Sequence, residues 1–181
     1  MTMASSLTII LDFIFRLACL AFLLRFLLQA ANADFYNPLS QAIVKATEPV
    51  CKPLRRLLRP FRNLDLASLL VAWLISVLFF VLLAWLRAPE LMNVLGLAWA
   101  GVIRTLLILI QFYFWTILIV IIASFVAQGN YHPVLGLLHQ LTEPLMAPIR
   151  KVLPPLGPLD LTPMVAIIIL TIAENILTQA Y

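Results

Sequence analysis

Two matched sets of polar residues could carry chemistry in this sequence, and they lie 95 residues apart. The first set is Thr47, Glu48, Arg55 and Asp65, and the second is Thr142, Glu143, Arg150 and Asp160. Each aspartate precedes an apolar segment, so it could cap the free N–H groups of the helix that follows. Alternatively, the two aspartates meet and form a cation site or a docking point for a partner. We favour capping, with the arginines paired to the aspartates or glutamates.

Both sets belong to a duplicated segment. Between 47–66 and 142–161, 10 of 20 positions are identical without a gap. The repeated residues include the prolines Pro49, Pro53, Pro144 and Pro148. Chance does not give this agreement, so we interpret the chain as two tandem repeats, residues 1–90 and 91–181.

The composition indicates an integral membrane protein. The chain has 181 residues, of which 64% are hydrophobic and 11% charged, whereas soluble domains are about half apolar and a quarter charged. No catalytic triad, nucleotide-binding loop or cysteine and histidine spacing for a metal is present. We therefore expect no enzyme activity, no cofactor and no metal site.

Four apolar segments are long enough to cross about 30 Å of hydrocarbon as helices. They cover roughly 7–31, 66–86, 105–127 and 161–177. The expected fold is all-α: four transmembrane helices in two parallel two-span repeats, related by an axis along the membrane normal. Each repeat then places its long loop on the same face of the membrane.

The distribution of basic residues predicts which face that is. The loops 37–65 and 132–160 hold eight of the twelve lysines and arginines, while the central hairpin has only Arg87 and Arg104 at its rims. Positive residues favour the cytoplasmic side. We expect a multi-pass protein of the bacterial inner membrane, with both loops cytoplasmic and both termini outside.

The long loops are expected to fold as amphipathic helices in the headgroup layer. Asn37-Pro38 and His132-Pro133 are typical helix starts, and Thr47 and Thr142 are interpreted as second caps. Pro49 and Pro53 are expected to prevent one continuous helix. The first loop also carries basic residues expected to contact anionic lipid, which are mostly absent from the second: Lys52, Arg56, Arg59 and Arg62.

Charged residues inside the spans are costly and usually face other helices. Asp12 and Arg16 are four residues apart on one helix face. With Arg104 and Glu174 they are predicted to form a polar cluster in the outer half of the bundle, either as a structural clasp or as an ion or proton path. Arg25 is expected to extend toward the cytoplasmic headgroups.

The sequence resembles the YggT family of bacterial membrane proteins, which has relatives in cyanobacteria and plastids. The resemblance covers nearly the whole chain and rests on three features of each repeat: an arginine near the end of the first span, here Arg25, the Thr-Glu-Pro loop motif, and the Leu-Asp pair that opens the second span. The first copy lacks the proline after the Leu-Asp motif, and the second copy has Val120 where Arg25 would align.

The resemblance implies a role in osmotic or salt stress tolerance, cell division or cytochrome maturation, without one unifying activity. We expect a non-catalytic protein that organises membrane lipid or an unidentified protein partner in the envelope. The alternative is a small cation channel or transporter for potassium or sodium, which requires a homo-oligomer because four spans rarely enclose a pore. The basic loop lacks interleaved aromatic residues, so no nucleic-acid partner is expected.

Overall fold

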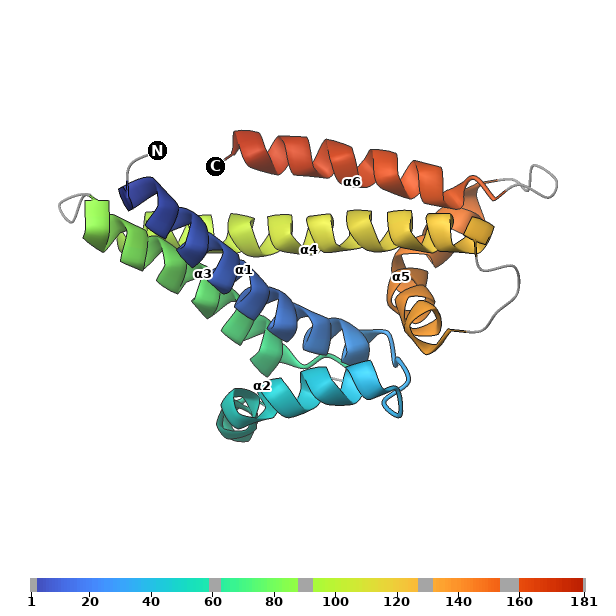
Figure 1. The fold of residues 1–181 in the computed structure, drawn as a ribbon, viewed down its shortest axis with the longest axis horizontal. Helices are drawn as coiled ribbons and strands as arrows, with labels where there is room; N and C mark the ends of the chain where they lie inside the picture. The colour runs from blue at the N-terminus through green and yellow to red at the C-terminus, as the bar shows by residue number, and fades with distance from the viewer. Residues whose placement is uncertain (1–2, 59–62, 88–92, 127–131, 154–159, 181) are drawn as a thin grey trace.

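The computed structural model describes residues 3–58, 63–87, 93–126, 132–153 and 160–180 of the chain. Over these residues its secondary-structure elements are six α-helices (Figure 1). In chain order the helices are α1 (Met3–Ala30), α2 (Pro38–Leu57), α3 (Leu66–Arg87), α4 (Val94–Val126), α5 (Pro133–Val152) and α6 (Thr162–Gln179).

Four of these helices are long and apolar enough to cross a membrane. The candidate spans are Ser6–Ala30, Leu66–Leu86, Val94–Ser124 and Thr162–Gln179, which confirms the expected fold class. The third span begins 11 residues before the expected position of 105 because residues 94–104 contain no proline. Asn93 also starts the helix, since its Oδ1 accepts a hydrogen bond from the backbone N–H of Leu95 at 3.2 Å.

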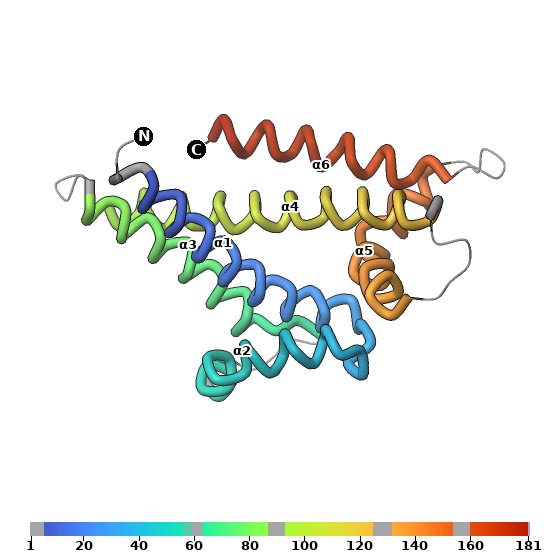
Figure 2. Tube along the Cα trace, in the orientation of Figure 1, coloured from blue at the N-terminus to red at the C-terminus, as the bar shows by residue number. Residues whose placement is uncertain are grey.

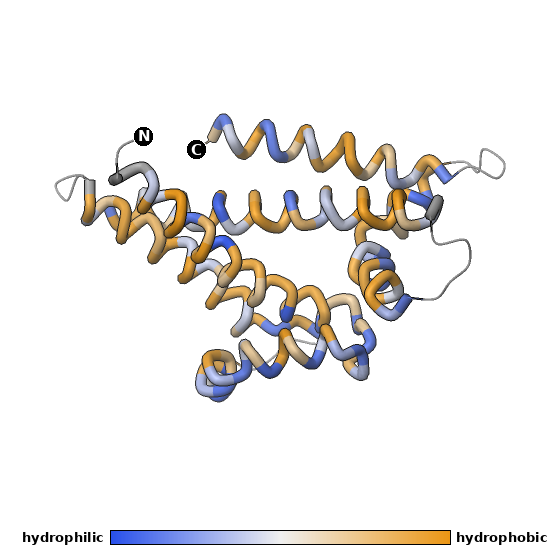
Figure 3. Tube along the Cα trace, in the orientation of Figure 1, coloured by the Kyte–Doolittle hydropathy of each residue, from blue (hydrophilic) through white to orange (hydrophobic). Residues whose placement is uncertain are grey.

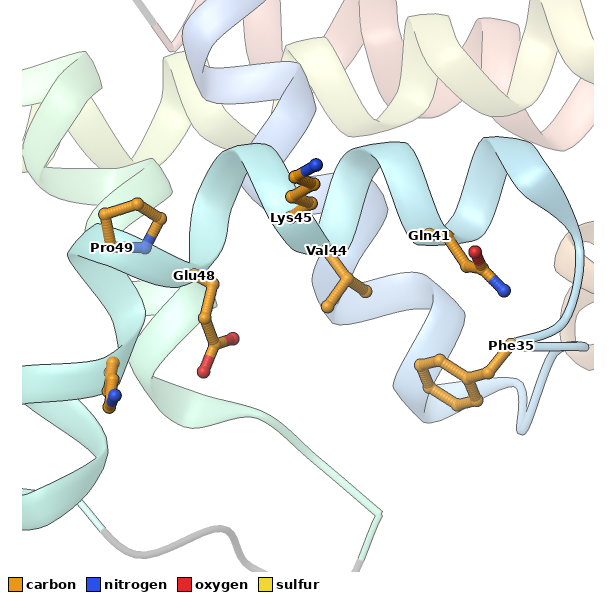
Figure 4. A pocket seen from close by; sticks show the side chains of 7 residues that line it. Phe35, Gln41, Val44, Lys45, Glu48 and Pro49 are labelled. Carbon is orange, nitrogen blue, oxygen red and sulfur yellow. The ribbon is translucent and has the colours of Figure 1, made fainter.

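The two loop helices, α2 and α5, are each continuous over 20 residues. The expected break at Pro49 and Pro53 was therefore wrong, because an internal proline removes one backbone hydrogen bond and bends a helix without necessarily ending it. Figure 4 shows the ribbon of α2 changing direction beside Pro49. Thr47 and Thr142 are interior residues rather than caps: Thr47 Oγ1 donates to the carbonyl oxygen of Ile43 at 2.7 Å, and Thr142 Oγ1 donates to that of Leu138 at 3.0 Å.

The predicted helix starts are present. Asn37 Oδ1 accepts a hydrogen bond from the N–H of Leu39 at 3.0 Å, and His132 Nδ1 accepts one from Val134 at 3.3 Å. A proline at the first position then costs nothing because its nitrogen would have no partner in the helix. Asn37 Nδ2 also donates to the carbonyl oxygen of Pro133 at 2.8 Å, which joins the starts of the two loop helices.

Each repeat packs its two spans against each other, α1 on α3 and α4 on α6, and α3 packs on α4 to join the repeats. Gly101 permits this junction, because a Cβ there would lie 2.4 Å from Cγ2 of Val77. Three apolar clusters form the core among the described residues. One surrounds Leu23 between α1, α2, α3 and α4, one surrounds Leu28 between α1 and α5, and one surrounds Ile117 between α4, α5 and α6.

Both chain termini lie at one end of the spans, and α2 and α5 lie toward the other (Figures 1 and 2). Apolar residues cover most of the spans, while polar residues concentrate on α2 and α5 (Figure 3). The loop helices α2 and α5 therefore lie at the end of the spans away from the chain termini. They belong to the two loops that hold most of the basic residues.

Candidate functional site

A buried arginine organises the end of the first repeat at which α1, α2 and α3 meet. Arg25, near the end of α1, is only 3% exposed. Its Nε donates to Asp65 Oδ2 at 3.2 Å, and its Nη1 donates to Thr47 Oγ1 at 2.9 Å and to the carbonyl oxygen of Val44 at 3.0 Å. Its Nη2 donates to Glu48 Oε2. The expectation that Arg25 extends to the headgroups was wrong, because these partners hold the guanidinium inside the protein.

Asp65 is the buried anion of this group. It lies immediately before α3, has no exposed surface, and accepts a hydrogen bond at Oδ1 from Arg55 Nε at 3.3 Å. Arg55 Nη2 also donates to Asp65 Oδ2. Burial alone would raise the pKa of Asp65, but the hydrogen bonds and charges of Arg55 and Arg25 outweigh it, so this pKa lies below its ordinary value.

We call Arg25, Thr47, Glu48, Arg55 and Asp65 the first-repeat clamp. It contains two guanidinium groups and two carboxylates, so its charges balance. Glu48 is partly exposed, and its hydrogen bond from Arg25 lowers its pKa. Because Arg25 lies on α1, Asp65 at the start of α3 and the other three on α2, the clamp fixes α2 to both spans of its repeat.

The corresponding residues of the second repeat form a looser group. Arg150 Nη1 lies 3.1 Å from Glu143 Oε1, and Arg150 Nε lies 3.8 Å from Asp160 Oδ2. All three side chains are about half exposed, at 50–54%. Val120 stands where Arg25 would align, so this group has no buried arginine.

The two aspartates also have different partners at the helix starts. Asp160 Oδ1 accepts a hydrogen bond from the backbone N–H of Thr162 at 2.9 Å, at the start of α6, as the capping prediction expects. Hydrogen bonding from the side chain and the backbone of Thr162 lowers the pKa of Asp160. The Asp65 carboxylate accepts hydrogen bonds from Arg25 and Arg55 instead. Each aspartate is paired with the arginines of its own repeat, so these contacts do not bring the two together in one site.

A groove runs along α2 beside the clamp. It has a volume of about 620 Å³ and is lined by Phe35, Gln41, Val44, Lys45, Glu48, Pro49 and Lys52. In Figure 4, Val44 and Glu48 project from α2 toward the side on which Phe35 lies. A second cavity of about 410 Å³ shares Phe35, Val44 and Glu48 with the groove and is also lined by Arg25 and Arg55.

Some of the predicted lipid-contacting residues lie at this groove. Lys52 lines it, and both Lys52 and Arg56 are exposed on α2. Arg59 and Arg62 lie outside the described residues. Lys45 also lines the groove and was not predicted to contact lipid, although it lies seven residues, or about two helical turns, before Lys52.

The predicted intramembrane cluster is a connected chain of contacts. Arg104 is 8% exposed, and its Nη1 lies 2.8 Å from Asp12 Oδ1. Asp12 also pairs with Arg16 at 3.6 Å, and Arg16 Nη1 donates to Gln111 Oε1 at 2.6 Å. Gln111 Nε2 then donates to Glu174 Oε1 at 2.7 Å. The chain of contacts therefore links α1, α4 and α6.

Two features of this polar cluster were not predicted. Gln111 was missed, although it is the only amide side chain in the long apolar run of α4. Arg104 lies ten residues inside α4 rather than at a rim, with its guanidinium carbon 3.7 Å from the ring centre of Phe79. A cation over an aromatic face is stabilised by the ring quadrupole, so Phe79 helps to hold this charge in the bundle.

Comparison with known proteins places the chain in a family. The CCB3/YggT family pattern matches residues 4–86 and again 99–181. An uncharacterized protein in the proC 3′ region of Vibrio alginolyticus is 40% identical over 94% of this chain and 92% of its own length. The uncharacterized protein YggT of Escherichia coli K12 is 37% identical over 92% of this chain and 86% of its own length.

An uncharacterized protein of Pseudomonas aeruginosa is 41% identical, over 84% of this chain and 78% of its own length. No solved structure matches the chain. The two family matches coincide with the two repeats that carry the clamp residues and their counterparts. The chain therefore belongs to the CCB3/YggT family of membrane proteins.

Proposed function

We propose that this protein is a non-enzymatic component of the bacterial inner membrane that holds anionic phospholipid on α2. The observation that carries the proposal is the groove on α2, which combines an apolar floor with two lysines. Phe35, Val44 and Pro49 offer contact to acyl chains or the glycerol backbone, while Lys45 and Lys52 offer positive charge to a phosphate.

The clamp leaves this charge available. Glu48 also lines the groove, but its carboxylate is bound by Arg25 and lies 3.9 Å from Arg55. Neither Lys45 nor Lys52 forms an ion pair with a carboxylate among the described residues. The groove can therefore attract an anion, and a juxtamembrane lysine contributes about 1 kcal/mol to binding an anionic surface.

The clamp also supplies the rigidity that a binding surface needs. Since Arg25, Arg55 and Asp65 join α2 to α1 and α3, the groove does not have to be ordered when lipid binds, and the entropy cost of binding is smaller. In this proposal α2 and α5 lie on the cytoplasmic side of the membrane. The positive-inside tendency favours basic residues on that side, and the cytoplasmic leaflet supplies the anionic headgroups.

A role under osmotic or salt stress follows from the same chemistry. Attraction between exposed charges is screened over about 8 Å at physiological ionic strength, and over shorter distances as salt rises. Lipid occupancy of the groove should therefore fall as cytoplasmic salt increases. That change would allow the protein to report salt to a partner in the envelope.

The test is the variant Lys45→Gln with Lys52→Gln. Together the substitutions should weaken retention of phosphatidylglycerol or cardiolipin by about 2 kcal/mol, a factor of about 30 in affinity. Bound lipid would be measured by mass spectrometry after purification from anionic membranes. The matched control is Lys151→Gln, an exposed basic residue of α5. Equal lipid retention by the double variant and the control would contradict the proposal.

A second candidate is a pathway for cations across an oligomer. It is supported by the chain of contacts from Asp12 to Glu174, in which Asp12 and Arg16 remain 35% and 45% exposed within the candidate spans. Partly exposed charges at membrane depth usually face water or another helix. Potassium or sodium flux into liposomes, lost in Glu174→Gln, would support this candidate over a purely lipid-binding role.

A further inference from the structure

The second repeat keeps the acidic half of the clamp but lacks its buried cation. The first-repeat clamp balances two arginines against two carboxylates, whereas the second has only Arg150 against Glu143 and Asp160. The position equivalent to Arg25 is Val120. The second group is therefore one positive charge short of the first.

A small cavity lies at the place of the missing side chain. It has a volume of about 90 Å³, and its lining includes Val120, His139, Thr142, Glu143, Arg150 and Asp160. All six lie 95 residues after residues of the first repeat that include Arg25 and its hydrogen-bonding partners. A water molecule takes about 30 Å³, so the cavity has room for a small ion with the size of a guanidinium group.

A buried hydroxyl in this cavity lacks the donor that its counterpart has. Thr142 is 4% exposed, and its Oγ1 donates to the carbonyl oxygens of Leu138 and His139 at 3.0 and 3.1 Å. In the first repeat Thr47 Oγ1 makes the same kind of bonds and also accepts one from Arg25. Within the described ranges, no group donates a hydrogen bond to Thr142 Oγ1.

Neighbouring groups do not replace the missing charge. Arg150 is half exposed and already paired with both carboxylates. Among the residues that the structure describes, the His139 side chain forms no hydrogen bond or ion pair with Glu143 or Asp160. The adjoining segments 127–131 and 154–159 contain no lysine or arginine in their sequence.

We propose that this cavity binds one monovalent nitrogen cation, a guanidinium or ammonium group, in the position that Arg25 fills in the first repeat. Its N–H groups would donate to Thr142 Oγ1 and to the carboxylates of Glu143 and Asp160. Such a group has two possible sources with the same chemistry: a soluble amine, or the headgroup ammonium of phosphatidylethanolamine. This proposal is independent of the lysine groove on α2.

The first experiment measures the melting temperature of the full chain in detergent. Guanidinium chloride or methylammonium chloride is added up to about 20 mM, too little for guanidinium to act as a denaturant. Tetramethylammonium chloride, which has no N–H donor, is the ionic-strength control. The wild type should gain about 2–4 °C relative to this control, and Glu143→Gln with Asp160→Asn should gain nothing. An equal melting temperature of the wild type in all three salts, together with no response to phosphatidylethanolamine in the lipid experiment below, would overturn the proposal.

A second variant places the missing guanidinium in the chain itself. Val120→Arg should raise the melting temperature and abolish the response to added cations, because its side chain occupies the cavity. Ile122→Arg is the matched control, since it adds an arginine to an exposed position of α4 outside the cavity lining. A folded Val120→Arg protein that keeps the full response would overturn the proposal. If this variant does not fold, the comparison of the wild type with the acid-neutralised variant decides alone.

The source of the cation is resolved in nanodiscs. Replacing phosphatidylcholine by phosphatidylethanolamine should raise the melting temperature of the wild type but not of the acid-neutralised variant if the ligand is a headgroup. A response to soluble ions without an effect of phosphatidylethanolamine assigns the site to a soluble amine. A response in neither arm contradicts the proposal.

Discussion

Arg25 and Asp65 are 40 residues apart in the sequence, yet their side chains meet at 3.2 Å with both almost completely excluded from solvent. One comes from the end of the first span and the other from the residue before the second span. Their contact closes the loop between the spans and holds α2 beneath them. Among the described residues of the second repeat no such buried pair exists, although the other four clamp residues are the same in the sequence.

Breaking the buried pair should be far more damaging than breaking its exposed counterpart. Arg25→Gln leaves the carboxylate of Asp65 buried with Arg55 as its remaining partner, and removing one member of a buried pair typically costs about 3–5 kcal/mol. Arg150→Gln removes a half-exposed pair, for which about 0–1 kcal/mol is expected. Unfolding by denaturant in detergent measures both variants, and similar losses would contradict the importance of burial.

The clamp should also make stability depend on acid pH. The pKa values of Asp65 and Glu48 lie below their ordinary values, which are about 3.9 and 4.3 in unfolded chains. As the pH falls the unfolded state therefore takes up protons first, so the stabilisation is complete above about pH 5 and is lost as the pH drops below 4 toward the folded values. Thermal unfolding of the wild type and of Asp65→Asn, measured from pH 3 to 7, checks this.

The variant is the control for that experiment. Asp65→Asn cannot lose a proton at this site, so its melting temperature should be lower at neutral pH and should fall less on acidification. An unchanged acid dependence in Asp65→Asn would mean that other carboxylates determine it.

Much of the fold could be predicted because its signals are local. The length of each apolar run indicates a span, and the repeated Thr-Glu-Pro and Leu-Asp motifs reveal the duplication. The clamp could be predicted only in part. Pairing of Arg55 with Asp65 or Glu48 was expected from their repetition, but the burial of Arg25 was not, because it depends on how α2 folds back against α1.

Other residues were missed for a similar reason. Gln111 connects Arg16 with Glu174, but it was not predicted because the prediction considered only charged residues inside the spans and Gln111 carries no charge. The continuity of α2 through Pro49 was also not predicted. Sequence rules count the hydrogen bond that a proline removes, but they do not count the tertiary contacts that hold the bent helix in place.

The membrane topology can be tested at the turn between α1 and α2. Cys19 and Cys51 are both fully buried and are poor targets for labelling, so they should be replaced by serine or alanine. Tyr36 is 88% exposed, and Tyr36→Cys should remain unlabelled by an impermeant thiol reagent in intact cells and become labelled after the membrane is opened. Labelling of Tyr36→Cys in intact cells would reverse the proposed topology.

The junction between the repeats depends on a close approach at one glycine. A Cβ added to Gly101 would lie 2.4 Å from Val77 Cγ2 and 3.2 Å from the backbone nitrogen of Val77. Val77 cannot relieve this clash by a small shift, because its β-branched side chain is stiff and lies on a packed helix. Small residues permit such helix contacts in membranes. Gly101→Ala should therefore separate α3 from α4 and destabilise the protein by about 1–3 kcal/mol.

Gly96 on the same helix provides the control. The atoms nearest to a Cβ there belong to the Asn93 side chain, at 3.5 Å or more, which is an ordinary contact. Since alanine favours a helix over glycine by about 1 kcal/mol, Gly96→Ala should be neutral or stabilising. Denaturant unfolding of both variants distinguishes packing from helix propensity, because propensity alone would stabilise both. A stabilised Gly101→Ala protein would show that α3 and α4 do not approach as closely as the structure has them.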